Sequence, residues 1–258
     1  MSRAKPIVLV TNDDGVAAPG IQALGQALAT RFETVIVAPH RERSAASHGI
    51  TLTTPLKIRP ALGPRGAKTY SVNGTPVDCV KLALATIFRR RMPDLLVSGI
   101  NLGSNTGINI IYSGTVSAAF EASLHGIPAI ATSLDTFSNP DFRACASFTA
   151  RLAARVLAMK GAGGILLNVN APNLPPGKIR GVAITSQGRF RHEGGYAPRV
   201  DPRGEKYYWA TIRARAFKES TGTDSEALKR GMISVTPIQY DVTEHARLDD
   251  LRRWDLKP

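Results

Sequence analysis

Short runs of apolar, mostly β-branched residues alternate with longer segments of helical spacing along the first 170 residues of the chain. The runs at residues 7–12, 35–38, 94–97, 127–131 and 165–169 have the length and apolar character of buried strands. Parallel strands need a helix or another long crossover between them. The alternation therefore predicts an α/β fold with a mostly parallel sheet flanked by helices.

The predicted helices carry recognisable ends. Pro19 suits the first position of a helix on which Ile21, Leu24 and Leu28 share one face. Gly126 suits the C-terminal cap of a later helix. The other predicted elements are extended segments at residues 50–59 and 69–73, helices from residue 75 and at residues 115–125, 141–160 and 223–230, a loop at residues 99–114, and a strand at residues 232–235.

The alternation stops after about residue 170, and residues 187–217 have a different composition. This segment is rich in Arg and Gly and holds six of the chain's sixteen aromatic residues. We expect it to form an extended hairpin that protrudes as an arm from a single domain spanning residues 1–258. The clustered Tyr207, Tyr208 and Trp209 favour burial of this arm against a partner subunit over a solvated hairpin.

The chain is basic, with 33 Lys and Arg against 20 Asp and Glu and a net charge of +13. Such a surface attracts nucleic acids, phosphorylated metabolites or membranes without choosing among them. No apolar run approaches the ~20 residues of a membrane-spanning helix, and the N-terminus has no signal-peptide pattern. We therefore predict a cytoplasmic protein without a membrane partner. Cys79 and Cys145 are too few for a disulfide framework and are expected to be reduced and buried.

The first chemical motif is Asn12-Asp13-Asp14-Gly15, directly after the first predicted strand. Ligands of open α/β sheets bind beyond the carboxyl ends of the strands, where this motif lies. Gly15 allows a turn that brings both carboxylates together, and a hard divalent cation would relieve their repulsion. The same residue types also form plain polar turns. The motif alone leaves a metal site and a structural turn open.

Two further polar segments follow strands and should reach the same edge of the sheet. In residues 41–48, Arg41 and Arg43 can clamp phosphate and the Ser44 hydroxyl can ligate a metal; a solvated charged loop is the alternative. The Gly- and Asn-rich loop at residues 99–114 is long for a compact domain, and loops of that length are usually functional. It ends where the next helix begins, and free N–H groups there can bind phosphate.

Several familiar catalytic signatures are absent from the chain. It has neither the Gly-x-x-x-x-Gly-Lys-Ser/Thr pattern of P-loop proteins nor the Gly-x-Ser-x-Gly elbow of serine hydrolases. His-Glu-x-x-His and paired Cys-x-x-Cys patterns are also missing, so zinc has no support in the sequence.

Several segments occur in a familiar order and spacing between residue 8 and about residue 133. They are Thr11 to Gly15 with Ala18 to Ile21, Val37 to Pro39 with Arg43-Ser44, Gly74 to Val80, Ser98 to Asn101, Tyr112 to Val116, and Gly126 to Ala129, with a weaker match at Thr223-Asp224 and Ser234 to Pro237. Together they resemble the SurE survival-protein family. The resemblance implies a Rossmann-like core and a divalent-metal phosphatase acting on nucleoside 5′- and 3′-monophosphates, with further activity on short polyphosphate.

The resemblance also carries the family's functional residues onto this chain. It implies one Mg²⁺ or Mn²⁺ ion per subunit on Asp13, Asp14, Ser44 and Asn101, of which Asp13, Asp14 and Asn101 are also catalytic. The implied phosphate-binding residues are Asn12, Gly103, Ser104, Asn105, Ser113, Gly114 and Thr115. Family members commonly exchange C-terminal segments, so a homodimer or homotetramer through the arm is expected.

Three positions depart from the family's usual pattern. Gly is common where this chain has Ala45, Asp where it has Asn109, and Gly where it has Ala122. None is a mapped metal ligand, but Asn109 removes a carboxylate that could affect local charge or substrate choice. Of two histidines close to these segments in the sequence, His48 could protonate the leaving group, contact the substrate or be solvated. His125 is expected to interact with the C-terminus of its helix.

The residues leave the mechanism and the function class open. Metal-activated water could attack the phosphate, or Asp13 or Asp14 could attack it and form an aspartyl-phosphate. The rival function is a nucleic-acid-binding protein without catalysis, in which the arm grips phosphates and stacks bases. A third possible function is that of a sensor that binds nucleotides without hydrolysing them. Nucleic acid is not expected as the principal partner, because that interpretation leaves the paired aspartates unexplained.

Overall fold

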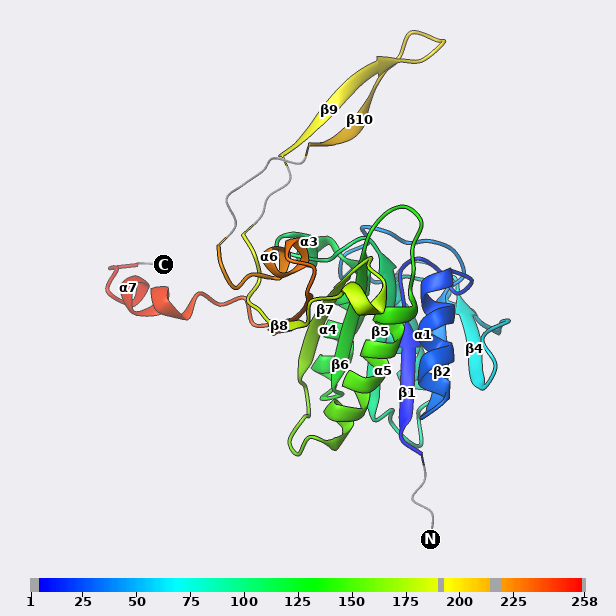
Figure 1. Cartoon of the computed structure of the whole chain (residues 1–258). Coiled ribbons are helices and arrows are strands. Elements are labelled where there is room, and N and C mark those ends of the chain that lie inside the picture. The colour runs from blue at the N-terminus through cyan, green and yellow to red at the C-terminus, as the bar shows by residue number, and fades with distance from the viewer. Residues whose placement is uncertain (1–4, 190–192, 214–219, 257–258) are drawn as a thin grey trace.

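The computed structural model describes residues 5–189, 193–213 and 220–256, and at its centre is a nine-stranded sheet (Figure 1). The strands lie in the order β3 (Ile58–Pro60), β4 (Ala67–Val72), β2 (Glu33–Pro39), β1 (Ile7–Thr11), β5 (Leu95–Leu102), β6 (Ala129–Asp135), β7 (Leu166–Pro172), β11 (Ile233–Ile238) and β8 (Val182–Ile184). All neighbours from β4 to β7 are parallel, and antiparallel pairs join β3 to β4 and β11 to β7. The predicted Rossmann-like α/β class is confirmed.

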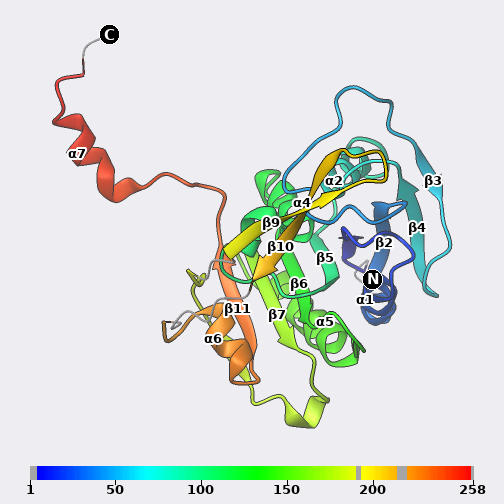
Figure 2. The same ribbon diagram turned by 90° about the horizontal axis from the view of Figure 1, so that it is seen from above.

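Four long helices cover the two faces of the sheet (Figures 1 and 2). The pair on one face is α1 (Pro19–Ala29) and α5 (Arg143–Ala158), and the pair on the other is α2 (Pro76–Thr86) and α4 (Gly114–Leu124). In β1, Val8 and Val10 pack with the first pair of helices, whereas Ile7 and Leu9 pack with the second. This division arises because successive side chains of a strand point to opposite faces.

The ends of these helices follow from nearby residues. Pro19 occupies the first turn of α1, and the three apolar residues predicted to share a face of that helix are buried. Thr75 caps α2, because its hydroxyl accepts from the Asp78 N–H at 3.1 Å while the Asp78 carboxylate accepts from the Thr75 N–H at 2.9 Å. Gly126 follows α4 with a φ of 73°, as expected of a C-terminal cap.

The order of the strands creates a crevice next to β1. From β1 the chain winds outward through β2 and β4, then returns to β5 on the opposite side of β1. Doubly wound sheets bind their ligands beyond the carboxyl ends of the strands at such a reversal. The topology therefore predicts a ligand site among the segments that follow β1, β2 and β5.

The predicted loop over residues 99–114 is wrong in its extent. The strand β5 continues to Leu102, α3 (Asn109–Tyr112) fills much of the second half, and α4 begins at Gly114. This part of β5 was predicted as a loop because it contains glycine and polar residues. It nevertheless pairs with β6, after a shift in register. Of the predicted extended segment at residues 50–59, only residues 58 and 59 lie in a strand, at the start of β3.

Several short elements were not predicted, because they are too short to show a periodic pattern. They are β8, α7 (Leu248–Arg252) and the 3-10 helices η1 (Pro176–Lys178) and η2 (His245–Arg247). In both views α7 lies away from the sheet (Figures 1 and 2). Across the described ranges, no helix combines the length and apolar character needed to cross a membrane.

The predicted arm is a two-stranded hairpin. Its strands, β9 (Glu193–Val200) and β10 (Lys206–Arg213), are antiparallel, with Lys206 opposite Val200. Parts of the predicted range, residues 190–192 and 214–217, lie outside the described residues. In Figure 1 the hairpin stands clear of the sheet, beyond the edge where α3 and α6 (Asp224–Lys229) lie.

Candidate active site

The chain turns sharply after β1 and presents two acidic residues at the crevice. Asp13 and Asp14 follow the strand, and Gly15 makes the turn with a φ of 101°. A Cβ atom on Gly15 would lie 3.1 Å from the backbone carbonyl carbon of Arg41. Glycine is therefore required both for the turn and for the close approach of the loop after β2.

Asp13 is held against the N-terminus of α4. Its carboxylate accepts a hydrogen bond from the Thr115 hydroxyl, and the N–H groups of Thr115 and Gly114 stabilise its charge further. Burial raises the pKa of Asp13, which is only 4% exposed, and these hydrogen bonds offset part of that rise.

Asp14 faces the end of β5. Its Oδ2 accepts a hydrogen bond from the Leu102 N–H at 3.3 Å. Burial, and after it the charge of Asp13, raises the pKa of Asp14 to about 7. Without a cation, the two acids therefore oppose each other's ionisation at neutral pH. A hard divalent cation would remove that opposition, so the pair fits a Mg²⁺ or Mn²⁺ site.

The other two predicted metal ligands come from the loop after β2 and from β5. The Arg43 N–H donates to the Asp13 carbonyl oxygen at 2.7 Å, which brings Ser44 close to the first turn. Asn101 follows the register shift in β5, and its amide nitrogen donates to the Gly103 carbonyl oxygen at 2.7 Å. That hydrogen bond leaves the Asn101 amide oxygen as the atom that can ligate a cation.

A cavity of about 230 Å³ opens among these segments. Its lining includes three of the four predicted metal ligands and four of the predicted phosphate-binding residues. The lining residues are Asp13, Ser44, Ala45, Asn101, Leu102, Gly103, Ser104, Asn105, Asn109, Tyr112, Ser113 and Phe137. The fold thus brings together residues from four segments far apart in the chain.

The remaining predicted site residues lie outside this lining. Thr115 contacts Asp13 directly, and a Cβ on Gly114 would lie 2.9 Å from that of Asp13. Asp14 meets the backbone of β5 next to the cavity. Asn12 is fully buried, and its amide donates to the Gly15 carbonyl oxygen at 2.9 Å, so it stabilises the turn rather than lining the cavity.

The segment at residues 103–107 is held by buried polar side chains. The Asn105 N–H donates to Asn170 Oδ1 at 2.7 Å, and the Asn105 amide donates to Ser133 Oγ at 2.9 Å. From the C-terminal part of the chain, the buried Asp224 carboxylate accepts from the Gly107 N–H at 3.0 Å. Hydrogen-bonded buried networks are rigid, so this side of the cavity is formed before any ligand binds.

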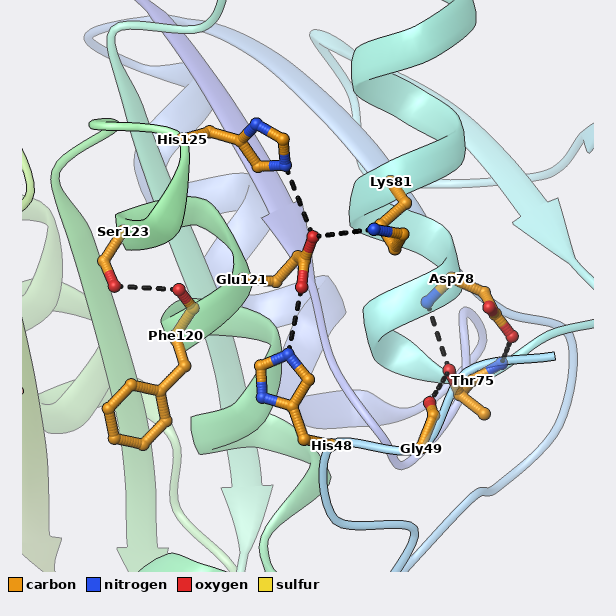
Figure 3. A network of polar contacts seen from close by, with 9 residues as sticks. All are labelled: His48, Gly49, Thr75, Asp78, Lys81, Phe120, Glu121, Ser123 and His125. Atoms are coloured by element: carbon orange, nitrogen blue, oxygen red, sulfur yellow. Dashed lines mark hydrogen bonds and ion pairs between the residues drawn. The ribbon is translucent and has the colours of Figure 1, made fainter. Parts of the chain in front are cut away.

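A second polar cluster surrounds Glu121 of α4 (Figure 3). The Glu121 carboxylate accepts from His48 Nε2 at 2.9 Å, Lys81 Nζ at 3.2 Å and His125 Nε2 at 3.3 Å. Burial alone would raise the pKa of Glu121, but these three partners bring it below its ordinary value. His48 therefore faces α4 and does not line the cavity, and His125, the C-cap residue of α4, binds the same carboxylate.

The donor set restricts which cation could bind. Within the described ranges, no group of three or more His, Cys, Asp or Glu side chains could hold a metal ion. A cation at Asp13 and Asp14 would need neutral oxygen ligands as well, which suits a hard ion rather than zinc. Cys79 and Cys145 are free and buried as predicted, and burial raises the pKa of Cys145 to about 11.

The sequence also matches known proteins along most of its length. The family model described as "Survival protein SurE" matches residues 8–194. The chain belongs to the SurE family. It is 46% identical over 250 residues to the 5′-nucleotidase SurE of Syntrophobacter fumaroxidans, a match covering 96% of this chain and 99% of that protein. It is 48% identical over 254 residues to the 5′-nucleotidase SurE of Geobacter metallireducens, covering 96% and 97%.

The fold of a solved SurE protein agrees with this membership. The crystal structure of the SurE protein from Aquifex aeolicus has a TM-score of 0.84 to this chain at 38% identity, covering 96% of this chain and 98% of that one. Two of the three departures from the usual SurE pattern, Ala45 and Asn109, line the cavity. The third, Ala122, is fully buried on the core-facing side of α4.

Two aromatic side chains of this SurE cavity, Phe137 and Tyr112, were not among the predicted site residues. Phe137 is 85% exposed and Tyr112 is 58% exposed, although both line it. Phe137 lies over Gly103, where a Cβ atom would come within 2.5 Å of the ring. The available signal was a phenylalanine in the polar segment after β6, at the same edge of the sheet as the acidic turn.

Proposed function

We propose that this chain is a divalent-metal-dependent nucleotidase that hydrolyses the phosphomonoester of nucleoside 5′-monophosphates. The observation that carries the proposal is the pair of adjacent aspartates, the buried Asp13 and the half-buried Asp14, beside a cavity that Ser44 and Asn101 also reach. The relatives named 5′-nucleotidase SurE support the substrate class. We extend the proposal to 3′-monophosphates and short polyphosphate as further substrates.

Asp13, Asp14, Ser44 and Asn101 would hold one Mg²⁺ or Mn²⁺ ion per subunit. When bound, such an ion polarises a phosphoryl oxygen and lowers the pKa of water. Thr115 orients the Asp13 carboxylate, and Asp14 lies beside it with a raised pKa, so either group can orient water or accept its proton. Attack by Asp13 or Asp14 on phosphorus is the other route, and trapping a phosphorylated aspartate would decide for it.

The phosphate would lie along residues 103–105 and Ser113. Gly103 has no side chain to fill the cavity, and the hydrogen-bonded loop keeps its backbone groups in place without further ordering. Ser113 caps α4 by accepting from the Val116 N–H at 3.1 Å. The N-terminus of α4 favours negative charge, both on Asp13 and on a phosphate beside it.

The nucleobase would stack on Phe137, with Tyr112 as a second aromatic surface. Exposed aromatic rings at the cavity suit a planar, apolar ligand group. Stacking tolerates every base, because each has a π face. This arrangement would favour nucleotides over simple sugar phosphates without strong selection among bases.

The test is phosphate release from a panel of 5′- and 3′-nucleoside monophosphates and short polyphosphate, with Mn²⁺ or Mg²⁺ and then with chelator. Asp14→Asn is compared with Asp141→Asn, which alters a partly exposed aspartate that is paired with Arg143 and does not line the cavity. Release that requires metal, survives Asp141→Asn and is lost in Asp14→Asn is the expected result. No release with any metal from the wild type would overturn the proposal.

For the arm we propose contact with a second copy of the chain, in a homodimer or homotetramer. Tyr208 and Trp209 are 60% and 65% exposed. Such exposure is unusual for neighbouring large aromatic side chains unless they contact another molecule. Light scattering of the wild type and of Tyr208→Ser/Trp209→Ser tests this, with a smaller assembly expected for the double variant. An unchanged mass, together with salt-sensitive binding of RNA or DNA by the wild type alone, would support the nucleic-acid alternative.

A further inference from the structure

The loop that carries Ser44 has an unfavourable backbone. It follows β2, and Ala45 and Ser47 have φ values of 58° and 47°. Non-glycine residues rarely adopt this left-handed region, and they remain there only when their surroundings hold them. The loop therefore needs contacts with the rest of the protein to keep Ser44 at the cavity.

Contacts from two neighbouring elements hold the loop on either side of His48. Ser47 donates through its N–H to the Tyr112 carbonyl oxygen at 3.3 Å and through its hydroxyl to the Ile111 carbonyl oxygen at 2.8 Å. The Gly49 carbonyl oxygen accepts from the Thr75 hydroxyl at 2.8 Å. Both contacts fix the backbone, but neither reaches α4.

His48 supplies the tie to α4. Its Nε2 lies 2.9 Å from Glu121 Oε2, and the other oxygen of that carboxylate binds Lys81 and His125 (Figure 3). Glu121 is only 5% exposed, so three cationic or polar groups fix its position inside the protein. A buried, multiply hydrogen-bonded carboxylate is a rigid anchor for a surface loop.

The same helix also positions Asp13. Thr115 in the first turn of α4 binds Asp13, and Glu121 lies about 9 Å farther along the helix axis at 1.5 Å per residue. One rigid helix therefore holds both the acidic turn and the loop of Ser44. The helix α4 therefore links two of the predicted metal ligands, Asp13 and Ser44. The linking side chains, Thr115, His48 and Glu121, do not themselves line the cavity.

We infer that His48 and Glu121 form a latch that holds the loop at residues 43–49 in the conformation that presents Ser44 to the metal site. Both are positioning residues. The inference deepens the proposed function and rests on it for the metal, but not for the order of the loop. The latch gives His48 no part in proton transfer, because its Nε2 is directed at Glu121 and the residue does not line the cavity.

The chain offers a matched control. His48→Ala and His125→Ala each remove one imidazole from Glu121, but only His48 connects α4 to the loop, whereas His125 is on α4 itself. His48→Gln keeps a donor that can reach the carboxylate and guards against loss of folding in the alanine variant. All three variants keep Asp13, Asp14, Ser44 and Asn101.

The first measurement is hydrogen–deuterium exchange in the metal-free protein. We expect His48→Ala to speed exchange of the amides at residues 43–49 by at least about fivefold, because local opening becomes easier. His125→Ala should stay within about twofold of the wild type. Equal exchange in the two alanine variants would overturn the latch.

The second measurement is Mn²⁺ binding by calorimetry. Loss of groups that orient metal ligands commonly weakens metal binding roughly 10- to 100-fold. We expect Mn²⁺ affinity to fall about tenfold in His48→Ala and to recover partly in His48→Gln. His125→Ala should bind Mn²⁺ nearly as well as the wild type. Unchanged Mn²⁺ affinity in His48→Ala would overturn the positioning of Ser44. If His48→Ala speeds exchange of the loop but the wild type releases no phosphate from any nucleotide, the latch is supported and the proposed function is contradicted.

Discussion

The Thr115 hydroxyl donates a hydrogen bond to the Asp13 carboxylate and so joins the N-terminus of α4 to the carboxyl end of β1. The two residues are 102 positions apart in the chain. Their contact places a buried carboxylate at the end of a helix where the helix dipole and free N–H groups favour negative charge.

Thr115→Val should impair catalysis more than folding. Valine keeps the volume of the side chain but removes the hydroxyl that orients Asp13, and a loss of about tenfold in kcat/KM is expected. Ser117→Ala, which removes another buried hydroxyl of α4, is the control and should retain activity. Steady-state kinetics with a nucleoside 5′-monophosphate measure both. Full activity in Thr115→Val would show that Asp13 does not depend on this hydrogen bond.

Asp14→Asn should stabilise the metal-free protein as pH rises. The folded protein keeps a proton on Asp14 up to about pH 7, whereas the unfolded chain releases it near 3.8. Ionisation therefore destabilises the fold increasingly as pH rises from about 4 to 7, and the loss is complete above that range. Asparagine removes this effect, which we place at about 1–2 kcal/mol after solvent screening.

The corresponding measurement is thermal unfolding in chelator at about pH 5 and pH 8. At the higher pH the Tm of Asp14→Asn should exceed that of the wild type by about 2–8 °C, and at the lower pH by less. A variant that is less stable than the wild type at both values would contradict the destabilising role of the ionised Asp14.

Ala45→Gly should increase stability, because glycine adopts a φ of 58° without the steric penalty that alanine meets. The gain is expected to be about 0.5–1 kcal/mol, reduced by the greater freedom of glycine in the unfolded chain. The neighbouring Ala46, by contrast, does not have a positive φ. Ala46→Gly should therefore destabilise the protein, and denaturant unfolding of both variants tests the opposite signs.

Phe137→Ala should weaken nucleotide binding without affecting phosphate chemistry. Loss of a stacking surface commonly removes about 1–3 kcal/mol, so KM for adenosine 5′-monophosphate should rise by roughly five- to 150-fold. Hydrolysis of ribose 5-phosphate, which has no base, is the internal control and should not change in either kcat or KM. Equal effects on both substrates would place Phe137 in the shape of the cavity rather than in base recognition.

Most of the fold could be predicted because strands and helix ends depend on residues close together in the chain. The apolar runs of β1 and β2, Pro19 at the start of α1 and Gly126 after α4 are local signals. The end of β5 was missed because its polar, glycine-containing residues remain a strand through pairing with β6. Phe137 was not predicted as a site residue because it reaches the cavity by lying over Gly103, which belongs to a different segment of the chain.

By itself, the sequence determined the alternation of strands and helices, the acidic turn after β1 and, through its resemblance to SurE proteins, a set of residues to look for. Only the tertiary structure decided which distant side chains meet. It joins His48 to Glu121 across 73 positions, brings Ser44 close to Asp13 through the loop after β2, and directs Asn12 away from the cavity. Such contacts depend on the register of parallel strands and on how helices pack against them, which no short stretch of sequence specifies.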